Sequence, residues 1–212
     1  MSITDIWSRE VDRIVRLMIK SRPMENITKT KLPNREDALR NREDILIAAK
    51  KVFCMQGIDV PLATIASTAD VGRATLYRNF PDRHALLTAL LDRYIDKVEE
   101  KAKAFSEFPD GLFKLFNSHT ETLCEYAPLV EYWRMIDRKD PAIVLLYIRL
   151  REIYKPLLEM AQKHQLCRAT LTVEDMLLIC PMLAVSLYQS DAVLQVKMAK
   201  HILKILMEGL TP

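Results

Sequence analysis

Apolar residues recur at helical spacing along most of this 212-residue chain, and few residues interrupt the pattern. Only four glycines are present, whereas strands joined by tight turns usually need more. Ten prolines mostly fall between the periodic segments and mark their ends. With 50% hydrophobic residues, the chain can bury a sizeable core. The sequence therefore predicts an all-α protein.

The periodic segments divide the chain into three parts. Residues 1–40 are predicted to hold an amphipathic helix, 3–20, followed by a polar, basic linker. Residues 41–88 contain short helices, and residues 89–212 form a larger helical bundle. The helices of this bundle, with the one that leads into it, are predicted at 81–104, 110–126, 128–137, 141–165, 172–188 and 191–208. We therefore expect two domains preceded by an arm.

Features of the composition exclude several classes of protein. The four cysteines are far apart and form no CxxC pair, so neither a zinc site nor a disulfide framework is expected. No apolar run reaches the roughly 18 residues that span a bilayer. Charged residues near the N-terminus interrupt any signal peptide. We expect a cytoplasmic protein without a membrane partner.

No pattern typical of catalysis stands out in the sequence. A Gly-rich phosphate loop, GxSxG, HExxH and paired carboxylates are all missing. His119, His164 and His201 have no metal-ligand spacing and are expected to be ordinary surface or core residues. We therefore expect neither enzymatic activity nor a metal or cofactor. A helical enzyme can hide its site, and turnover of a bound ligand would reveal one.

Positive charge gathers in residues 20–42. This segment carries seven basic and three acidic side chains, an excess of four charges, whereas the whole chain has a net charge of +3. A basic arm beside a folded domain is typical of nucleic-acid binding, and a solvated linker explains it equally well. The preceding helix, 3–20, could dock a partner or lie on a membrane surface, and Met24 offers another start site.

A helix, a short helix, a tight turn and another short helix follow one another between Asn41 and Phe80. Asn41 is predicted to cap the first helix and Gly57 to end it. Pro61 lies in the first turn of the second helix, and Gly72 begins the third. The expected core positions are Ile45, Leu46, Ala48, Ala49, Val52, Phe53, Ile65, Ala66, Ala69, Val71, Leu76 and Phe80. This order is the helix-turn-helix pattern.

The third helix of this pattern has two distinct faces. Leu76 and Phe80 lie on the apolar side. The other side carries Thr75, Tyr77, Arg78 and Asn79. Hydroxyl, amide and guanidinium groups donate hydrogen bonds to phosphates and base edges, so this face is predicted to meet DNA.

The run from Gly57 to Leu86, centred on TLYRNF, resembles the DNA-binding domain of TetR-type transcriptional repressors. The resemblance is specific over about residues 41–90, because spacing and residue types agree there, and beyond them it covers only the general layout. It implies that Thr75 and Tyr77 contact phosphates, and that Asn79, where His is common, also donates to one. The other DNA-binding candidates are Arg73, Ala74 and Arg78 for base or backbone contacts, Arg83 in place of the usual Lys, and Arg42 from the basic segment.

Three residues depart from the family pattern. Pro61 replaces the Thr that usually caps the second helix, Asp70 replaces the turn Gly, and Gly72 replaces a Ser or Thr cap. Asp enters the left-handed conformation more readily than most residues, and Gly can cap a helix with a small loss. The departures therefore weaken the assignment of individual contacts more than the fold.

The last two predicted helices, 172–188 and 191–208, are the most continuously apolar. A helix that is apolar on several sides must bury more than one face. The second face could be ordinary core or could meet a second copy, and the resemblance implies the latter, a homodimer through these two helices. A two-fold dimer would present two recognition helices to an inverted repeat in double-stranded DNA.

The resemblance also implies an effector pocket in the middle helices. The candidate lining residues are Phe113, Phe116, Tyr126, Glu131, Trp133 and Tyr147. Aromatic walls with a carboxylate suit a lipophilic cation, whereas aromatics at helical spacing are also ordinary core.

The combined interpretation is a ligand-responsive, homodimeric repressor that a small hydrophobic effector releases from an inverted-repeat operator. A lipophilic cation is one candidate effector, and the DNA-bound protein would lie at the nucleoid. The alternative is a TetR-like DNA-binding protein without a small-molecule ligand, controlled by a protein partner that docks on the N-terminal helix. Repression is what the resemblance implies.

Overall fold

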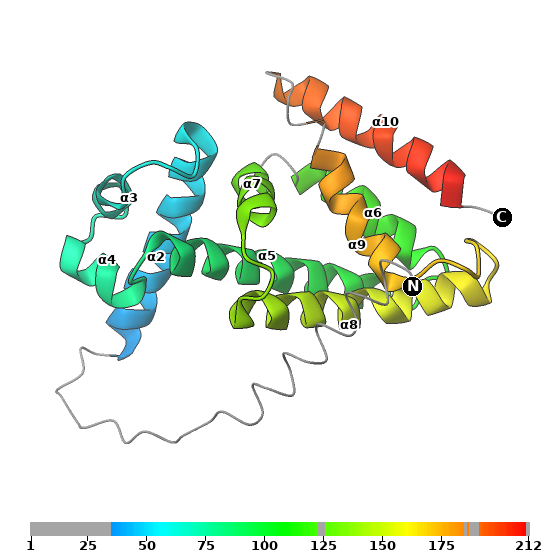
Figure 1. The fold of residues 1–212 in the computed structure, drawn as a ribbon, viewed down its shortest axis with the longest axis horizontal. Helices are drawn as coiled ribbons and strands as arrows, with labels where there is room; N and C mark the ends of the chain where they lie inside the picture. Colours follow the sequence, from blue (N-terminus) through cyan, green and yellow to red (C-terminus); the bar gives the residue numbers. More distant parts are fainter. Residues whose placement is uncertain (1–34, 123–125, 185, 187–190, 211–212) are drawn as a thin grey trace. The chain divides into compact units, whose positions relative to one another are not determined.

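The computed structural model describes residues 35–122, 126–184, 186 and 191–210, and its regular structure in these ranges is helical without a strand (Figure 1). The elements are α2 (Arg35–Gln56), α3 (Leu62–Thr68), α4 (Arg73–Asn79), α5 (Arg83–Phe105), α6 (Gly111–Thr122), α7 (Ala127–Met135), α8 (Pro141–Lys163), α9 (Val173–Leu183) and α10 (Ala192–Leu210). The all-α fold class is confirmed. The predicted helix at 3–20 lies outside the described residues.

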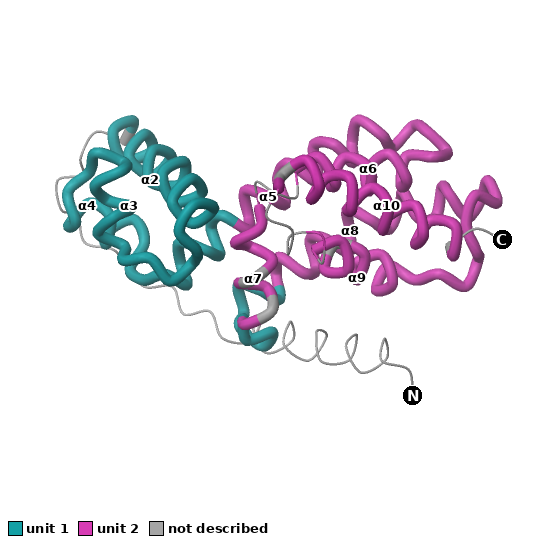
Figure 2. The backbone as a smooth tube through the Cα atoms, turned by 90° about the horizontal axis from the view of Figure 1, so that it is seen from above, with its two compact units in different colours: residues 1–90, 136–144 teal, residues 91–135, 145–212 magenta. Residues whose placement is uncertain are grey.

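The chain forms two compact units (Figure 2). Of the described residues, the first unit contains those up to Leu90 together with Ile136–Val144. The second unit contains the described residues of Leu91–Met135 and those from Leu145 onward. The division falls within α5, so the first turns of this helix belong to one unit and its remainder to the other.

Helix α2 begins at Arg35, ahead of the predicted cap Asn41, which lies inside the helix. The prediction for Asn41 is therefore wrong. Glu36 and Asp37 occupy the first turn, where carboxylates favour the positive end of the helix dipole. The residues from 36 to 40 are all exposed, so no buried apolar stripe marks this extension in the sequence.

The core of the first unit is built from one face of each helix. Helices α2, α3 and α4 contact one another pairwise. Their buried residues are Ile45, Leu46, Ala48, Ala49, Val52 and Phe53 of α2, Ile65 and Ala66 of α3, and Leu76 of α4, together with Phe80. These positions were predicted as core. Burying each large apolar side chain contributes about 1.5–3 kcal/mol, so this stripe holds the three helices together.

Two residues with positive φ set the connections around α3. Helix α2 ends before Gly57, whose φ of 82° few other residues adopt, as the sequence predicted. Asp70 has a φ of 54° in the turn between α3 and α4, where the family pattern has Gly. The next amide, Val71 N–H, donates to Ala66 O at 3.0 Å. Asp70 therefore adopts the left-handed conformation that this turn requires, although the family pattern has Gly at the position.

The second unit contains α6, α7, α9, α10 and most of α5 and α8. Arg149 of α8 holds the acidic side of α5, donating to Asp92 at 3.0 Å, Asp96 at 2.6 Å and Glu99 at 3.1 Å. Hydrogen bonds from Lys103 and Arg149 lower the pKa of Glu99 to about 2. Charge-assisted bonds of this kind fix α5 against α8, the helices that carry Tyr94 and Tyr154 of the pocket described below.

Within the described ranges, no helix combines the length and the apolar character that crossing a bilayer requires. The same ranges hold no group of His, Cys, Asp and Glu side chains placed to bind a metal ion.

Candidate functional site

Helix α4 is short and is oriented by two buried side chains. Leu76 is 1% exposed and so is Phe80, which follows the helix in an extended conformation. Gly72 stands at the N-cap without a side-chain hydrogen bond, so the backbone alone begins the helix. With one face buried against α2 and α3, the opposite face of α4 has to lie outward.

The outward face of α4 carries the predicted DNA contacts. Arg73, Ala74 and Arg78 are exposed, and Tyr77 is 50% exposed. Two guanidinium groups and a phenol hydroxyl on two turns of helix supply donors that suit phosphate oxygens and guanine edges. A half-exposed tyrosine between two arginines fits a surface that a partner covers.

Thr75 and Asn79 are half-buried at the edge of this face and bond within the helix. Arg78 Nη2 donates to Thr75 Oγ1 at 3.0 Å, and Asn79 Nδ2 donates to Thr75 O at 2.9 Å. The Thr75 hydroxyl and the Asn79 amide each keep a further hydrogen that can reach a phosphate. These bonds hold the arginine and the amide in place before any DNA arrives.

Arg42 and Arg83 have structural contacts that the sequence did not indicate. Arg42 Nη1 donates to Asn79 O at 3.2 Å, and its guanidinium carbon lies 4.3 Å from the centre of the Phe80 ring. A cation on the last carbonyls of α4 satisfies groups that the helix leaves unpaired. Arg83 donates to Ile58 O and, at 3.2 Å, to Asp59 O, so it ties α5 to the loop before α3. Their contact with DNA stays a prediction.

The basic segment 20–42 is described only from residue 35 onward. Arg40 and Arg42 lie there on exposed positions of α2, so the helix and not a flexible arm carries them.

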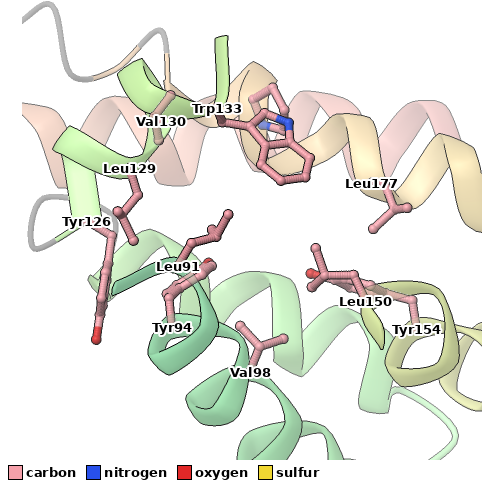
Figure 3. A pocket seen from close by; sticks show the side chains of 11 residues that line it. Leu91, Tyr94, Val98, Tyr126, Leu129, Val130, Trp133, Leu150, Tyr154 and Leu177 are labelled. Atoms are coloured by element: carbon pink, nitrogen blue, oxygen red, sulfur yellow. The ribbon is translucent and has the colours of Figure 1, made fainter. Parts of the chain in front are cut away.

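The second unit holds a pocket of about 90 Å³ (Figure 3). Its lining residues are Leu91, Tyr94, Val98, Tyr126, Leu129, Val130, Trp133, Leu150, Tyr154, Leu177 and Pro181. In Figure 3, Trp133 of α7 faces Tyr94 and Val98 of α5 across this space. No acidic or basic side chain of the described residues lines it. The wall is apolar apart from tyrosine hydroxyls and the indole N–H.

The six predicted ligand residues are not all at this pocket. Tyr126 and Trp133 line it, and Phe116 is buried behind it, stacked on Tyr154 at 5.5 Å between ring centres. Phe113 and Tyr147 are half-buried elsewhere in the unit. The Glu131 side chain lies outside the described ones. A carboxylate in the wall, which motivated the cationic effector, is therefore not among the groups that line the described pocket.

A buried histidine joins two of the pocket tyrosines. His119 of α6 is 2% exposed, with Nδ1 at 3.1 Å from the Tyr94 hydroxyl and Nε2 at 2.7 Å from the Tyr154 hydroxyl. Burial, with a smaller effect of nearby Lys101, lowers the pKa of His119 to about 3, so the ring is neutral near pH 7. The sequence offered no signal for this cluster, because its members lie on three helices far apart in the chain.

The last two helices expose large apolar side chains. Leu178 of α9 is 58% exposed, and on α10 Val193 is 62% and Ile205 55% exposed. Helix α10 also contacts α6 and α9 through a buried side that includes Ala199 and Leu203. Each helix is thus apolar on a buried side and on an outer side.

Comparisons with known proteins agree with the geometry of the first unit. Residues 45–90 match the family model of bacterial regulatory proteins of the tetR family. A TetR transcription regulatory protein from Mycobacterium vanbaalenii is 24% identical, with 85% of this chain and 100% of that chain covered and a TM-score of 0.57. A TetR family transcriptional regulator from Agrobacterium tumefaciens is 15% identical, with 82% and 100% covered and a TM-score of 0.62.

A third solved structure is a gamma-butyrolactone receptor described as ArpA-like, 20% identical, with 83% of this chain and 90% of that chain covered and a TM-score of 0.57. Comparison with curated protein sequences gives no significant match. Residues 45–90 therefore match the helix-turn-helix domain of tetR-family regulatory proteins, and the solved structures of TetR-type regulators share the all-helical fold of this chain. The resemblance read from the sequence is confirmed.

Proposed function

We propose that the protein is a homodimeric repressor that inserts α4 into the major groove of an inverted-repeat operator. The outward face of α4 carries this proposal, because Arg73, Tyr77 and Arg78 are exposed while Leu76 and Phe80 anchor the helix from behind. Phosphate contacts from such a face supply affinity that falls with salt, and arginines at base edges supply sequence preference. Arg42 would act mainly by holding the end of α4.

The dimer is proposed to form through the outer sides of α9 and α10. Leu178, Val193 and Ile205 are large apolar side chains, each more than half exposed, that a second copy could cover. A two-fold pair of these helices would bury them in a shared bundle. The predicted range 172–188 is described as a helix only over Val173–Leu183.

A small molecule in the pocket is proposed to release the DNA. The described residues that line the pocket are apolar or carry only neutral hydroxyl and indole groups, which favours a neutral effector over the lipophilic cation suggested by the sequence. One of the similar structures is named a gamma-butyrolactone receptor, which supports a small-molecule effector in this fold. The alternative, control by a protein partner that docks on the predicted N-terminal helix, depends on residues outside the described ones.

Release requires that the effector bind one conformer of the protein better than another. The pocket of about 90 Å³ is small for a ligand site, so a ligand that widens it would favour a different arrangement of the helices around it. Helix α5 contributes residues to this pocket, and its first turns belong to the first unit. The segment 136–144, which contains the connection from α7 to α8 and the start of α8, also belongs to the first unit. There Asp140 pairs with His84 of α5 at 3.0 Å.

Selection of bound duplexes from a random DNA pool tests the proposal. The wild type should enrich an inverted repeat, and Tyr77→Ala should enrich it much more weakly. Met55→Ala, which removes a 72% exposed side chain from α2, is the matched control and should select like the wild type. If no motif emerges, or if Tyr77→Ala selects equally well, α4 is not the recognition helix.

A further inference from the structure

The residues of α4 are divided into a centre and two flanks by their angles around the helix axis. Because an α-helix turns about 100° per residue, Arg78 lies about 160° around the axis from the buried Leu76. Thr75 and Tyr77 each lie about 100° from Leu76, on opposite sides of the helix. Arg73 lies only about 60° from Leu76, on the side of Tyr77. Arg78 is therefore the polar residue of α4 that points most directly away from the core.

The Arg78 side chain runs back toward the first turn of α4. Helical side chains tilt toward the N-terminus, and Arg78 Nη2 donates to Thr75 Oγ1, three residues earlier, at 3.0 Å. Ala74 shares the outward side of the helix with Arg78, is exposed, and has only a methyl group there. The guanidinium is thus drawn toward the first turn, the part of a recognition helix that contacts base edges.

The Arg78 guanidinium keeps enough donors for a guanine. Thr75 uses one of the five N–H groups of an arginine, so four remain, and the N7 and O6 atoms of guanine need two. No carboxylate of the described residues pairs with Arg78, so the protein does not neutralise its charge there. A guanidinium that is already held on one side also loses less conformational freedom when it binds.

Thr75 can connect this arginine to the DNA backbone. Its hydroxyl oxygen accepts the bond from Arg78, and no other described residue bonds to the hydroxyl, so its hydrogen can be donated to a phosphate oxygen. Donation to a phosphate makes the hydroxyl oxygen a better acceptor, and DNA over the helix excludes competing water. The phosphate contact and the base contact therefore strengthen each other through one hydroxyl.

Arg73 has neither of these features. Its side chain is exposed at the start of the helix, and no described residue forms a hydrogen bond or ion pair with its guanidinium. An arginine on a flank of the helix suits a phosphate, which attracts a cation without carrying sequence information. The two arginines of α4 are thus expected to have different roles.

We propose that Arg78 recognises one guanine in each half-site of the operator and that Thr75 is the positioning residue that couples this contact to a phosphate. Arg73 contacts the backbone and contributes affinity without sequence preference. The inference rests on the proposed function, because it assigns the base recognition by α4 to one of its two arginines.

Selection of duplexes from a random pool with matched variants is the first test. The wild type should enrich an inverted repeat, and Arg78→Ala should enrich the same repeat without preference at one guanine of each half-site. Arg73→Ala is the matched control, because it removes the same charge from the same helix, and it should keep that guanine. Circular dichroism checks that each variant is folded.

Two duplexes measure the size of the effect: the selected operator, and a copy in which that guanine is replaced by adenine in both half-sites. Fluorescence anisotropy should give the wild type at least about a 25-fold preference for the operator, because each bidentate contact contributes about fivefold or more. Arg78→Ala and Arg78→Gln should each reduce the preference to about threefold or less, since neither side chain has the guanidinium fork. Arg73→Ala should weaken binding to both duplexes equally and lower its dependence on salt.

Variants of Thr75 test the positioning role. Thr75→Val keeps the shape of the side chain and removes the hydroxyl, and it should reduce the preference for the operator to below about tenfold. Thr75→Ser keeps the hydroxyl and should keep a preference near that of the wild type. A merely structural role for Thr75 would weaken binding to both duplexes alike and leave the preference at the wild-type value.

The outcomes separate this inference from the proposed function. A guanine preference that survives in Arg78→Ala, or that disappears in Arg73→Ala, overturns the assignment of the two arginines while the repressor proposal stands. An unchanged preference in Thr75→Val overturns the positioning role. If the wild type enriches no motif, the inference and the DNA-binding part of the proposed function fail together.

Discussion

The proposed DNA-binding face of α4 and the proposed effector pocket of the second unit place polar side chains in opposite ways. On α4 they lie on the outside of one short helix, with Leu76 and Phe80 as the buried anchors. In the pocket, Tyr94 of α5 and Tyr154 of α8 belong to the wall, and both bond to His119 of α6. The first arrangement depends on local spacing along one helix, and the second depends on how separate helices pack. A substitution on the outward face of α4 should therefore weaken binding with little loss of stability, whereas a substitution among the packed helices should lower stability.

The largest expected effect is a difference in stability loss between a substitution on the buried side of α4 and one on its exposed side. Phe80→Ala should lower the free energy of unfolding by about 3–5 kcal/mol, because it empties a site that is 1% exposed. Tyr77→Ala, next to the same core, should change it by less than about 0.5 kcal/mol while weakening DNA binding. Urea unfolding measures both variants. Equal stability losses would mean that α4 does not divide into an anchoring and a binding face.

The next effect concerns the outer apolar sides of α9 and α10. Leu178→Asp should raise the dimer dissociation constant at least about a hundredfold, because a carboxylate would be buried without a partner. Analytical ultracentrifugation follows the change over a dilution series. Leu145→Asp, at a 53% exposed site on α8, is the control for adding an exposed charge. An unchanged dimer in Leu178→Asp would remove this surface from the interface.

The pH dependence of the free energy of unfolding tests the burial of His119, in contrast to the exposed polar side chains of α4. The pKa of His119 is about 3 in the folded protein and near its ordinary value of 6.5 in the unfolded chain. Above pH 6.5 neither state binds the proton, and below it the unfolded state binds it first, so folding loses stability as pH falls.

Between pH 6.5 and pH 5 the free energy of unfolding should therefore fall by roughly 1–2 kcal/mol through this residue. His119→Gln, which can still bond to tyrosine, should fall by clearly less over the same range in urea titrations. Parallel profiles for the two proteins would show that His119 accepts a proton as easily when folded as when unfolded.

The smallest effect compares two arginines on α2. Arg42→Ala should lower the free energy of unfolding by about 1 kcal/mol, because the last carbonyl of α4 and the Phe80 ring lose their cation. Arg40→Ala removes the same charge from an exposed position without those contacts and should leave stability nearly unchanged. Thermal unfolding of the pair measures the difference. If both variants have the wild-type melting temperature, the contacts of Arg42 with Asn79 O and the Phe80 ring do not stabilise the fold.

Local patterns were sufficient for the DNA-binding fold. The apolar stripe from Ile45 to Phe53, Gly57 at the end of α2 and the TLYRNF run depend on interactions within a few turns, so their spacing alone predicted the helices and the recognition face. The beginning of α2 was missed, because residues 36–40 are exposed and leave no apolar stripe. The structural role of Arg42 was missed because its acceptor, Asn79 O, lies 37 residues away in the chain.

The pocket was predicted only as a group of aromatic residues. Tyr126 and Trp133 were found because an aromatic on an apolar face marks either core or pocket, but that same signal also selected Phe113, Phe116 and Tyr147. The sequence by itself determined the helices, the turn and the identity of the outward face, because these depend on neighbours along the chain. Only the tertiary structure decided that His119 joins Tyr94 to Tyr154, because helix packing brings three distant segments together and buries His119 and Tyr154.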